Sequence, residues 1–563
     1  MEDRFWHKAY AENVPPTINY DTLTLSQVLD RTAQRYPETV ALIMMGKTIT
    51  YRQLNELVNR FATALADLGV EKGDKVSLIL PNMPQVIIAA YAVFRLGAAV
   101  VMNNPLYTET ELAHQLNDSE SKIAIGMDLL VPRLLSLKEK TGIETIISCH
   151  IRDYLPFPKK QLFPFVKKKM HRKINPSDGV LEFMDLIKRY PAEPPKREVQ
   201  FDDLAALLYT GGTTGVSKGV VLSHANCSTC VQQLRAWLPD AVEGKDSMLG
   251  TFPVFHTAGF TTGMNTAIYR GLTYILIPRP DPGSVLEMTR KYKPNWFPCV
   301  PTLFVGVLAH KDFKKTSFSS VKGCVSGAAP LALETIKQWK ATVGADIVEC
   351  YGLTETSTLS HANPWGGKLK PGSVGVPVPD TDCRIVDVDT GTKDMPLGES
   401  GEVILKGPQV TSGYHNQPEE TADTIRDGWL HTGDIGYMDD EGYLFIVDRK
   451  KDMIIAGGYN IYPRDIDEIL YEHPKIREAC VIGIPDAYRG ETVKAFIALE
   501  AGQNITEEEV RAWCKEKLAS YKVPKQVEVM DELPKSAIGK VLRRKLKEME
   551  MAKTTAAGGS AGS

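Results

Sequence analysis

A glycine- and threonine-rich stretch, Tyr209-Thr-Gly-Gly-Thr-Thr-Gly-Val-Ser-Lys-Gly219, carries the strongest chemical signal in the sequence. Its glycines let backbone N–H groups approach an anion, its threonines add hydroxyl donors, and Lys218 adds positive charge, so the stretch suits a phosphate. It is not a Walker A loop, because a glycine and a strand-like run follow the lysine where that motif has Ser or Thr and a helix. By composition alone, the stretch is either a phosphate cradle or an ordinary hairpin turn.

Five more motifs follow this stretch along the chain. They are Gly327-Ala-Ala-Pro330, Tyr351-Gly-Leu-Thr-Glu-Thr356, Gly428-Trp-Leu-His-Thr-Gly-Asp434, Asp448-Arg449 and Pro534-Lys-Ser-Ala-Ile-Gly-Lys540. Together and in this order, they resemble the adenylate-forming superfamily, which contains acyl-CoA synthetases, adenylation domains of peptide synthetases and beetle luciferases. The resemblance extends from about residue 25 to residue 547, and several motifs in a fixed order are far more specific than any one of them.

The resemblance implies a reaction in two steps. A carboxylic acid and ATP give acyl-AMP and pyrophosphate, and the thiol of coenzyme A then displaces AMP. Attack of a carboxylate on the α-phosphate brings two anions together, so cations and oriented N–H donors must stabilise the transition state. ATP and coenzyme A are therefore expected as co-substrates, with Mg²⁺ as the cofactor.

The resemblance also assigns residues to the nucleotide site. These residues are Thr210, Gly211, Gly212, Thr213, Thr214, Gly215, Lys218, Gly327, Ala328, Ala329, Pro330, Tyr351, Gly352, Thr354, Asp434 and Arg449. By analogy, Tyr351 stacks on adenine, Thr354 bonds the α-phosphate, and Asp434 and Arg449 bond the ribose. Thr210 and Glu355 are expected to hold Mg²⁺, because hard oxygen ligands suit that ion. Read alone, each position also has an ordinary structural explanation, such as a surface acid at Glu355 or a turn residue at Asp434.

Lys540 is the expected catalytic lysine, together with Glu355 and Thr210. By family analogy, Lys540 bridges the substrate carboxylate and the α-phosphate during adenylation only. Lys451 falls where the family has its hinge, and rotation there brings Gly457-Gly458 toward the acyl-adenylate to line the coenzyme A tunnel. Without the resemblance, a lysine in a basic stretch such as this one is a solvated surface residue.

The stretch Phe252-Pro-Val-Phe-His-Thr-Ala-Gly-Phe260 corresponds to the lining of the acyl site in the family. Relatives that activate amino acids place an Asp here, and this stretch has none, so an uncharged acyl group is expected because an unpaired buried ammonium is costly. His256 and Phe260 are the predicted acyl-pocket residues, although His256 also fits a packed structural role. Residues 103–118 and the basic stretch before Asp178 resemble medium- and long-chain fatty acyl-CoA synthetases.

The expected function is therefore a fatty acid:CoA ligase. Three alternatives stay open: an aryl or aryl-alkanoic acid:CoA ligase, an enzyme that loads a carrier-protein thiol, and a nucleotide- or lipid-binding protein without catalysis. Intact Lys540, Glu355 and Asp434 weigh against the last of these. The oligomeric state, monomer or homodimer, is left open.

The elements that must position these residues follow from hydrophobic periodicity. Thr50 is a suitable N-cap for an amphipathic helix that Gly69 stops, and an apolar run at 76–80, a helix-like stretch at 85–96 and a second apolar run at 98–102 follow it. This alternation predicts an α/β class with mixed and parallel sheets in a large N-terminal domain of several subdomains, residues 1–450. Residues 451–550, with Thr506 and Glu509 as a capping box, are expected to form a small, mobile α+β domain, and residues 551–563 a disordered tail.

Composition narrows the possible partners. The chain has 563 residues, and 66 Lys and Arg against 69 Asp and Glu leave a formal charge of −3, which gives no global attraction for nucleic acid. The scattered cysteines and the polar first ten residues favour a cytoplasmic protein without a signal peptide. Residues 159–173 are basic and partly apolar without any acid, so they predict either peripheral contact with an anionic membrane or a solvated excursion, and the prolines at 158 and 164 exclude one continuous helix.

Overall fold

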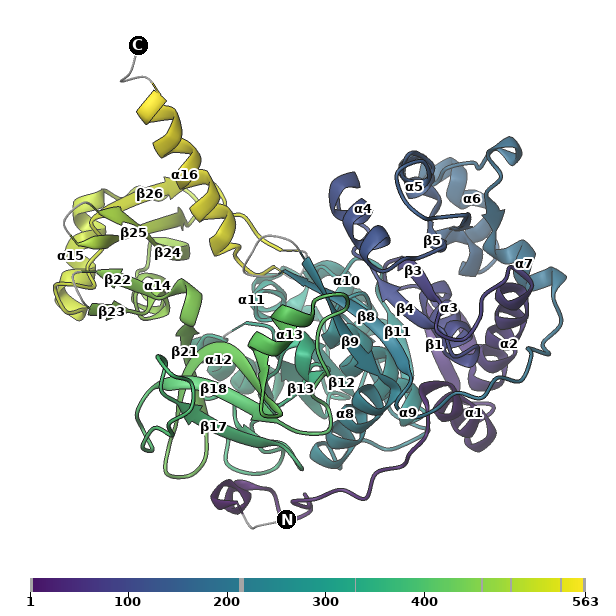
Figure 1. Cartoon of the computed structure of the whole chain (residues 1–563), viewed down its shortest axis with the longest axis horizontal. Helices are drawn as coiled ribbons and strands as arrows, with labels where there is room; N and C mark the ends of the chain where they lie inside the picture. Colours follow the sequence, from purple (N-terminus) through teal and green to yellow (C-terminus); the bar gives the residue numbers. More distant parts are fainter. Residues whose placement is uncertain are drawn as a thin grey trace. The chain divides into compact units, whose positions relative to one another are not determined.

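The computed structural model describes residues 4–211, 217–329, 331–456, 459–486, 489–536 and 539–559. The chain divides into two compact units (Figure 1). Unit 1 comprises residues 1–382 and 405–430, and unit 2 comprises residues 383–404 and 431–563. The predicted domain boundary after residue 450 falls inside unit 2. The hinge expected there, at Lys451, stays a prediction.

The first sheet of unit 1 is parallel except at one edge. Its strands, in spatial order, are β7 (Leu181–Glu182), β6 (Thr145–Cys149), β5 (Ile123–Met127), β3 (Lys75–Ile79), β4 (Ala99–Met102), β8 (Leu204–Gly211) and β9 (Ser217–Ser223). Only β8 and β9 pair antiparallel among the described strands of this sheet. The central strands are buried on both faces, as is usual when helices cover both sides of a parallel sheet.

The second sheet of unit 1 begins and ends with antiparallel strands. In spatial order it contains β16 (Val376–Pro377), β15 (His361–Ala362), β14 (Ile347–Tyr351), β13 (Gly323–Ser326), β12 (Trp296–Cys299), β10 (Ser247–Gly250), β11 (Thr273–Leu276), β1 (Val40–Met44) and β2 (Lys47–Thr50). The strands from β14 to β1 run parallel. These two sheets confirm the predicted α/β class.

Most helices of unit 1 have buried apolar residues; α13 (Pro418–Thr424) has none and α6 (Lys159–Val166) has only Phe163. The helices of unit 1 are α1 (Leu25–Arg35), α2 (Tyr51–Asp67), α3 (Pro84–Arg95), α4 (Glu109–Asp118), α5 (Val131–Lys138), α6, α7 (Phe183–Arg189), α8 (His224–Trp237), α9 (Thr266–Tyr269), α10 (Pro282–Tyr292), α11 (Pro301–Ala309), α12 (Leu333–Val343) and α13. The Thr50 side chain accepts from the Gln53 backbone N–H, so the predicted cap of α2 is confirmed. The apolar stretch 86–102 is the wholly buried α3 followed by β4, also as predicted.

Unit 2 contains two smaller sheets. One joins β17 (Asp382–Val386), β18 (Gly401–Lys406), β20 (Trp429–Met438) and β19 (Ile425–Arg426), with β21 (Leu444–Arg449) paired to β20; β19 itself belongs to the residues of unit 1. The other joins β23 (Tyr459–Ile461), β22 (Ile454–Ala456), β25 (Gly490–Leu499) and β24 (Ile476–Asp486), with β26 (Gln526–Met530) paired to β25. The helices are α14 (Pro463–Tyr471), α15 (Glu507–Lys517) and α16 (Arg543–Gly559).

Two predictions concern the C-terminal helices. The predicted capping box at Thr506 and Glu509 is present at the start of α15. Helix α16 runs to Gly559 and so includes residues 551–559, which the sequence analysis assigned to a disordered tail; residues 560–563 lie outside the described part.

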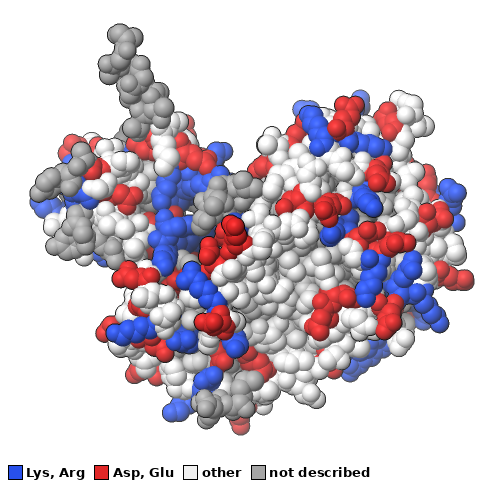
Figure 2. All heavy atoms as spheres, viewed as in Figure 1, with Lys and Arg blue, Asp and Glu red and all other residues white. Residues whose placement is uncertain are grey.

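Two surface properties bear on partners. Within the ranges given above, no helix combines the length and apolar character needed to cross a membrane. On the face drawn in Figure 2, Lys and Arg side chains lie among Asp and Glu side chains around an area that carries neither. This mixture agrees with the near-balanced formal charge of the sequence.

Candidate active site

The glycine- and threonine-rich stretch joins the two strands of one hairpin. Strands β8 and β9 pair antiparallel to their ends, with Thr210 opposite Lys218 and Gly211 opposite Ser217. The chain therefore turns between two strands here, in contrast to a Walker A loop, which leads from a strand into a helix. Gly212, Thr213, Thr214 and Gly215 lie outside the described residues.

Lys218 already has an anionic neighbour. Its ammonium pairs with Glu420 of α13 and lies 5.5 Å from the centre of the Tyr414 ring, and its side chain is only 8% exposed. A buried cation needs such a partner, because removal from water is costly without one. A phosphate that approaches Lys218 must therefore compete with, or displace, the Glu420 carboxylate.

Two further motifs meet at one edge of the second sheet. Gly327, Ala328 and Ala329 follow β13, and Tyr351 is the last residue of β14. Because β13 and β14 are parallel neighbours, both motifs stand at the same carboxyl edge, where α/β sheets bind ligands. The turn after β13 places Ala328 at φ 72°. Pro330 is not among the described residues.

Glu355 is fixed in place through its backbone and its carboxylate. It lies in the short 3-10 turn Thr354–Thr356, where its C=O accepts from the Thr411 N–H at 2.8 Å and its Oε1 accepts from the Tyr414 hydroxyl at 2.8 Å. Burial and the Glu355 charge raise the pKa of the Tyr414 phenol, so Tyr414 stays protonated and donates. The start of this turn requires Gly352, because a Cβ there would lie 2.1 Å from the Thr358 carbonyl oxygen.

The stretch 252–260 folds back on itself beside the core. A π-helical segment, Ala258–Asn265, begins in it, and the His256 carbonyl accepts from the Phe260 N–H. The Phe260 ring is fully buried, with its centroid 6.3 Å from that of Phe94. Gly259 touches the start of the stretch, because a Cβ there would lie 2.0 Å from the Pro253 carbonyl oxygen.

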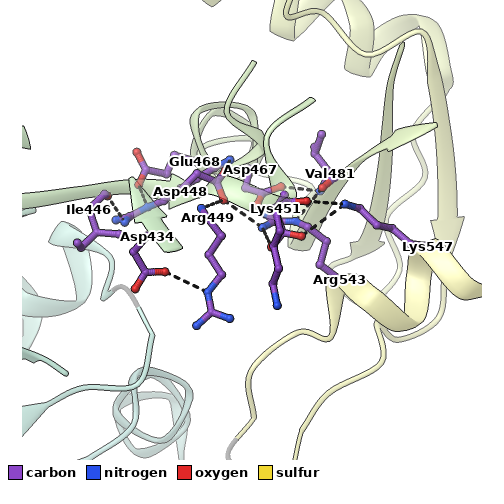
Figure 3. A network of polar contacts seen from close by, with 12 residues as sticks. Asp434, Ile446, Asp448, Arg449, Lys451, Asp467, Glu468, Val481, Arg543 and Lys547 are labelled. Carbon is purple, nitrogen blue, oxygen red and sulfur yellow. Dashed lines mark hydrogen bonds and ion pairs between the residues drawn. The ribbon is translucent and has the colours of Figure 1, made fainter. Parts of the chain in front are cut away.

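In unit 2, Asp434 of β20 and Arg449 at the end of β21 face each other across the strand pair. Arg449 Nε lies 3.2 Å from Asp434 Oδ1, and the Asp434 side chain is buried (Figure 3). Two groups that both hydrogen-bond hydroxyls well are thus held side by side on adjacent strands. The sequence motifs did not predict this pairing, because the two residues belong to separate motifs.

Lys540 lies close enough to this pair to experience its charges. The Lys540 side chain is exposed. Partial desolvation of the ammonium and the nearby Arg449 cation nevertheless lower the pKa of Lys540 to about 8, whereas the Asp434 carboxylate acts in the opposite direction. Lys451 follows β21 in the turn Lys450–Asp452, and burial and Arg449 lower its pKa. Gly457 and Gly458 lie outside the described residues.

A separate polar cluster lies in unit 1. His150 Nδ1 and Nε2 lie 2.9 Å from Asp128 Oδ2 and Glu182 Oε2, and His171 Nδ1 lies 3.2 Å from the same Asp128 oxygen. Burial alone would lower the pKa of His150, but the two carboxylates outweigh it and raise the pKa to about 9. Potential ligand atoms of Asp128, His150 and His171 lie within 4.8 Å of one another, and both imidazoles contact the Asp128 carboxylate, so this polar clamp ties together the segments that carry these residues.

Among the residues that the structure describes, Lys218 and Glu355 both lie against Tyr414 in unit 1, and Asp434, Arg449 and Lys540 lie near one another in unit 2. Three partners were not predicted from the sequence: Tyr414, Glu420 and Asp118. The Asp118 carboxylate accepts from the Tyr209 hydroxyl at 2.6 Å. No local pattern marks these partners, because 59 residues separate Tyr414 from Glu355 and 91 separate Tyr209 from Asp118. Cys227 and Cys230, which form a C-x-x-C, are buried on α8.

Comparison with known proteins defines the class. Residues 29–415 match the AMP-binding enzyme family, and residues 465–540 match the AMP-binding enzyme C-terminal domain. The chain belongs to this family, which confirms the resemblance to adenylate-forming enzymes.

Curated relatives are more specific. A long-chain-fatty-acid–CoA ligase of Bacillus subtilis is 44% identical over 97% of this chain and 98% of its own, and one of Escherichia coli is 38% identical over the same shares. Among solved structures, ATP-bound MatB from Rhodopseudomonas palustris has a TM-score of 0.82 at 29% identity and covers 94% of this chain and 99% of its own. The anthranilate CoA ligase AuaEII, in complex with anthranoyl-AMP, has a TM-score of 0.82 at 29% identity and covers 94% of this chain and 97% of its own.

Proposed function

We propose that this protein is a fatty acid:CoA ligase for long-chain acids. ATP and the acid give acyl-AMP and pyrophosphate, and coenzyme A then takes the acyl group and releases AMP. The observation that carries this proposal is the similarity to long-chain-fatty-acid–CoA ligases over nearly the whole chain, including both the AMP-binding region and the C-terminal domain.

The residues of unit 1 serve to bind and orient ATP in this proposal. Tyr351 stacks on adenine, the Gly327 to Pro330 backbone lines the base, and Thr354 bonds the α-phosphate. The loop from Thr210 to Lys218 donates N–H and hydroxyl hydrogens to the β- and γ-phosphates, and Lys218 exchanges Glu420 for phosphate. Such preorganised donors stabilise charge without reorganisation during the reaction.

Mg²⁺ fits the donor set of this unit. Thr210 offers a hydroxyl and Glu355 a carboxylate that Tyr414 already orients at 2.8 Å, and oxygen ligands of this kind suit Mg²⁺. The ion would neutralise phosphate charge when bound. Glu355 and Thr210 would hold it, and the remaining contacts to ATP come from the protein.

The residues of unit 2 contribute the ribose contacts and the mobile lysine. Asp434 accepts from the ribose hydroxyls, and Arg449 bonds the ribose. Lys540 places its ammonium between the acid's carboxylate and the α-phosphate, where it reduces the repulsion between two anions as the oxygen attacks phosphorus and pyrophosphate leaves. Rotation about Lys451 then withdraws Lys540 and brings Gly457-Gly458 to the pantetheine arm.

The acyl chain is proposed to enter beside the stretch 252–260. Phe260 is buried against Phe94 on a π-helical segment, and π-helical turns are places where a helix can re-register. An aromatic ring at that point can act as a gate for the acyl tunnel. His256, which contacts the backbone N–H of Ala258, lies one turn before the ring.

A panel of acids tests the function. Purified protein is given ATP, Mg²⁺, coenzyme A and one acid at a time, from benzoate through octanoate to palmitate, and pyrophosphate and thioester are measured. We expect acid-dependent pyrophosphate release with the highest kcat/KM for long chains. Preference for benzoate would favour the aryl acid alternative, and acylation of a carrier protein but not of coenzyme A would favour the carrier-loading alternative. If no acid in the panel causes release of pyrophosphate, the alternative of a non-catalytic nucleotide- or lipid-binding protein is favoured.

We also infer that residues 154–173, here called the basic segment, contact an anionic membrane. Its exposed apolar side chains are Phe157 (83% exposed), Phe165 (74%), Val166 (71%) and Leu162 (52%). Its exposed cations are Lys159, Lys160, Lys167, Lys168, Lys169, Arg172 and Lys173. Protruding rings next to cations suit a bilayer that offers acyl chains below anionic headgroups. Helix α6 contains Pro164 and ends two residues after it, and a separate 3-10 turn, Lys168–Met170, follows, so the segment is not one continuous helix, as the sequence predicted.

The basic segment is firmly attached to unit 1. Tyr154, Leu155 and Phe163 are buried in the core, and the His171 side chain and the Arg172 backbone N–H both bond Asp128 in the polar clamp. The exposed rings are therefore presented on a fixed base. Long-chain fatty acids partition into bilayers, so a protein that binds the membrane through this surface lies close to its proposed substrate.

Flotation with vesicles tests this contact. Wild-type protein should float with vesicles that contain phosphatidylglycerol, less at high salt, and little with pure phosphatidylcholine. The triple variant Phe157→Ser, Phe165→Ser, Val166→Ser should bind at least about 10-fold more weakly, because apolar insertion is lost. The control Leu106→Ser, at a site 79% exposed, should bind as wild type. Equal flotation of both variants would contradict the proposal, and sedimentation of the same samples would show whether the surface instead joins two copies.

A further inference from the structure

Arg543 stands three residues after Lys540, at the start of α16. Two backbone hydrogen bonds flank the segment that carries Lys540: the Ser536 N–H donates to the Lys540 carbonyl at 2.8 Å, and the Leu542 N–H donates to the Pro534 carbonyl at 2.7 Å. The backbone of Lys540 is thus hydrogen-bonded to Ser536, and Arg543 begins the helix that follows.

The Arg543 guanidinium is surrounded by carboxylates (Figure 3). Its Nη2 lies 2.5 Å from Asp467 Oδ2, its Nη1 lies 3.4 Å from Asp448 Oδ1 and 3.5 Å from Asp452 Oδ2, and its Nε donates to the Val481 carbonyl at 2.9 Å. Burial alone would lower the pKa of Arg543, but these carboxylates outweigh it and raise the pKa, so the group stays charged.

These partners lie on different sides of Lys451 in the sequence. Asp467 and Val481 follow Lys451, as Arg543 does, whereas Asp448 precedes it. Asp448 also accepts from the Arg464 N–H at 2.7 Å through its Oδ2 and from the Arg449 N–H at 2.7 Å through its Oδ1. A continuous chain of contacts therefore leads from the segment that carries Lys540, through Arg543 and Asp448, to Arg449.

We propose that Arg543 is a positioning residue that holds Lys540 for adenylation through its contact with Asp448. The proposal rests on the proposed function and on a hinge at Lys451. Rotation there would part residues up to 450 from those beyond 452, so the contact between Arg543 and Asp448 must break while the contact with Asp467 persists. The Asp448 contact therefore stabilises only the arrangement in which Lys540 experiences the charges of Arg449 and Asp434.

Separate assays of the two half-reactions test this role. Adenylation is measured as palmitate-dependent ATP–pyrophosphate exchange, and thioester formation as acyl-CoA produced from supplied palmitoyl-AMP. Arg543→Gln and Asp448→Asn should lower kcat for adenylation by about 10- to 100-fold at unchanged KM for ATP, and should leave thioester formation within about threefold of wild type. Arg543→Lys should recover part of the lost adenylation, because it keeps the charge.

Two controls separate positioning from folding. Asp467→Asn removes a partner of the same guanidinium on the same side of the hinge, so it should change both half-reactions by the same factor. Arg544→Gln, at an exposed position paired with Glu548, should change neither. If Arg543→Gln does not fold, Asp448→Asn carries the test, because Asp448 is the partner of Arg543 that precedes Lys451.

The outcomes distinguish the two levels of the proposal. Equal losses in both half-reactions for Asp448→Asn, in a wild-type background that is active, would overturn the positioning role alone. Absence of palmitate-dependent exchange in the wild-type protein would overturn the proposed function, and the positioning role with it.

Discussion

In unit 1, the residues assigned to ATP stand at strand ends within parallel sheets, and in unit 2, the assigned lysine stands on a loop that ion pairs hold. Tyr351 ends β14 and Thr210 lies near the end of β8, so ladder hydrogen bonds fix both. Lys540 depends instead on Arg543 and its carboxylate partners. Ladders are not broken in a domain rotation, whereas a contact between two side chains can be exchanged. The difference suggests fixed nucleotide contacts in unit 1 and a replaceable one in unit 2.

The largest expected effect is that of Lys540→Ala. Adenylation should fall by about 100- to 1,000-fold, because one oriented cation is lost from the charged transition state. Thioester formation from supplied acyl-AMP should stay within roughly threefold of wild type, because the proposed role of Lys540 ends with the first step. ATP–pyrophosphate exchange and acyl-CoA formation are the two measurements. Equal losses in both would remove the proposed division between the units.

Tyr351→Ala should act on both half-reactions. Loss of a stacking surface for adenine is expected to weaken each by about 10-fold, since AMP stays bound through both steps. Tyr351→Phe keeps the ring and serves as the control, with near wild-type rates. An effect on one half-reaction only would show that the adenine contact in unit 1 is not fixed.

The pH profile of adenylation should reflect Lys540. Its pKa of about 8 in the free protein means that the ammonium is present below pH 8 and lost above it. We therefore expect kcat/KM to fall about tenfold per pH unit above about pH 8, since kcat/KM follows ionisation in the free enzyme. Lys540→Arg, which stays charged, should give a lower but flat profile over pH 7 to 10. A wild-type profile that is flat to pH 10 would contradict the assignment.

Phe260→Ala should change selectivity more than rate. Removal of a buried ring beside the proposed acyl tunnel is expected to shift the ratio of kcat/KM between palmitate and octanoate by about 10-fold. It should also lower the free energy of unfolding by about 3 to 5 kcal/mol, as for other buried Phe→Ala changes. Phe297→Ala, at an equally buried ring in a different core cluster, controls for that loss and should leave the ratio unchanged. An equal change in the palmitate-to-octanoate ratio of kcat/KM in the two variants would contradict the proposal that Phe260 gates the acyl tunnel.

His150→Gln should have the smallest effect. The folded-state pKa of His150 is about 9 and thus above the ordinary value of 6.5, so its stabilisation is complete below about pH 6.5 and disappears as pH rises through 9. The groups that face it are Asp128, Glu182 and His171. Between pH 6.5 and 9.5, Tm should fall by about 2 °C more in wild type than in the variant. The same slope in both proteins would show that the clamp does not titrate as proposed.

The sequence was most informative where periodicity is local. The cap of α2 at Thr50, the buried α3 and β4, and the capping box at Thr506 follow from spacing within one element, and the structure confirms them. Of the two readings of the glycine- and threonine-rich stretch, the structure shows antiparallel strands at both of its ends, and the phosphate-binding role stays a prediction. Arg543 had no sequence signal, since its partner Asp448 lies 95 residues away and only tertiary packing brings them together.

The close approach of Gly259 to Pro253 has a practical consequence for redesign. The first and last parts of the stretch 252–260 support each other through a backbone contact that no side chain at 259 can share. If single residues are exchanged for those of a relative with another acyl preference, one side of this contact changes while the other side keeps its original residues. Under the proposed acyl-site role, transplanting residues 252–260 together, with Gly259 retained, should preserve this backbone contact and transfer selectivity between relatives.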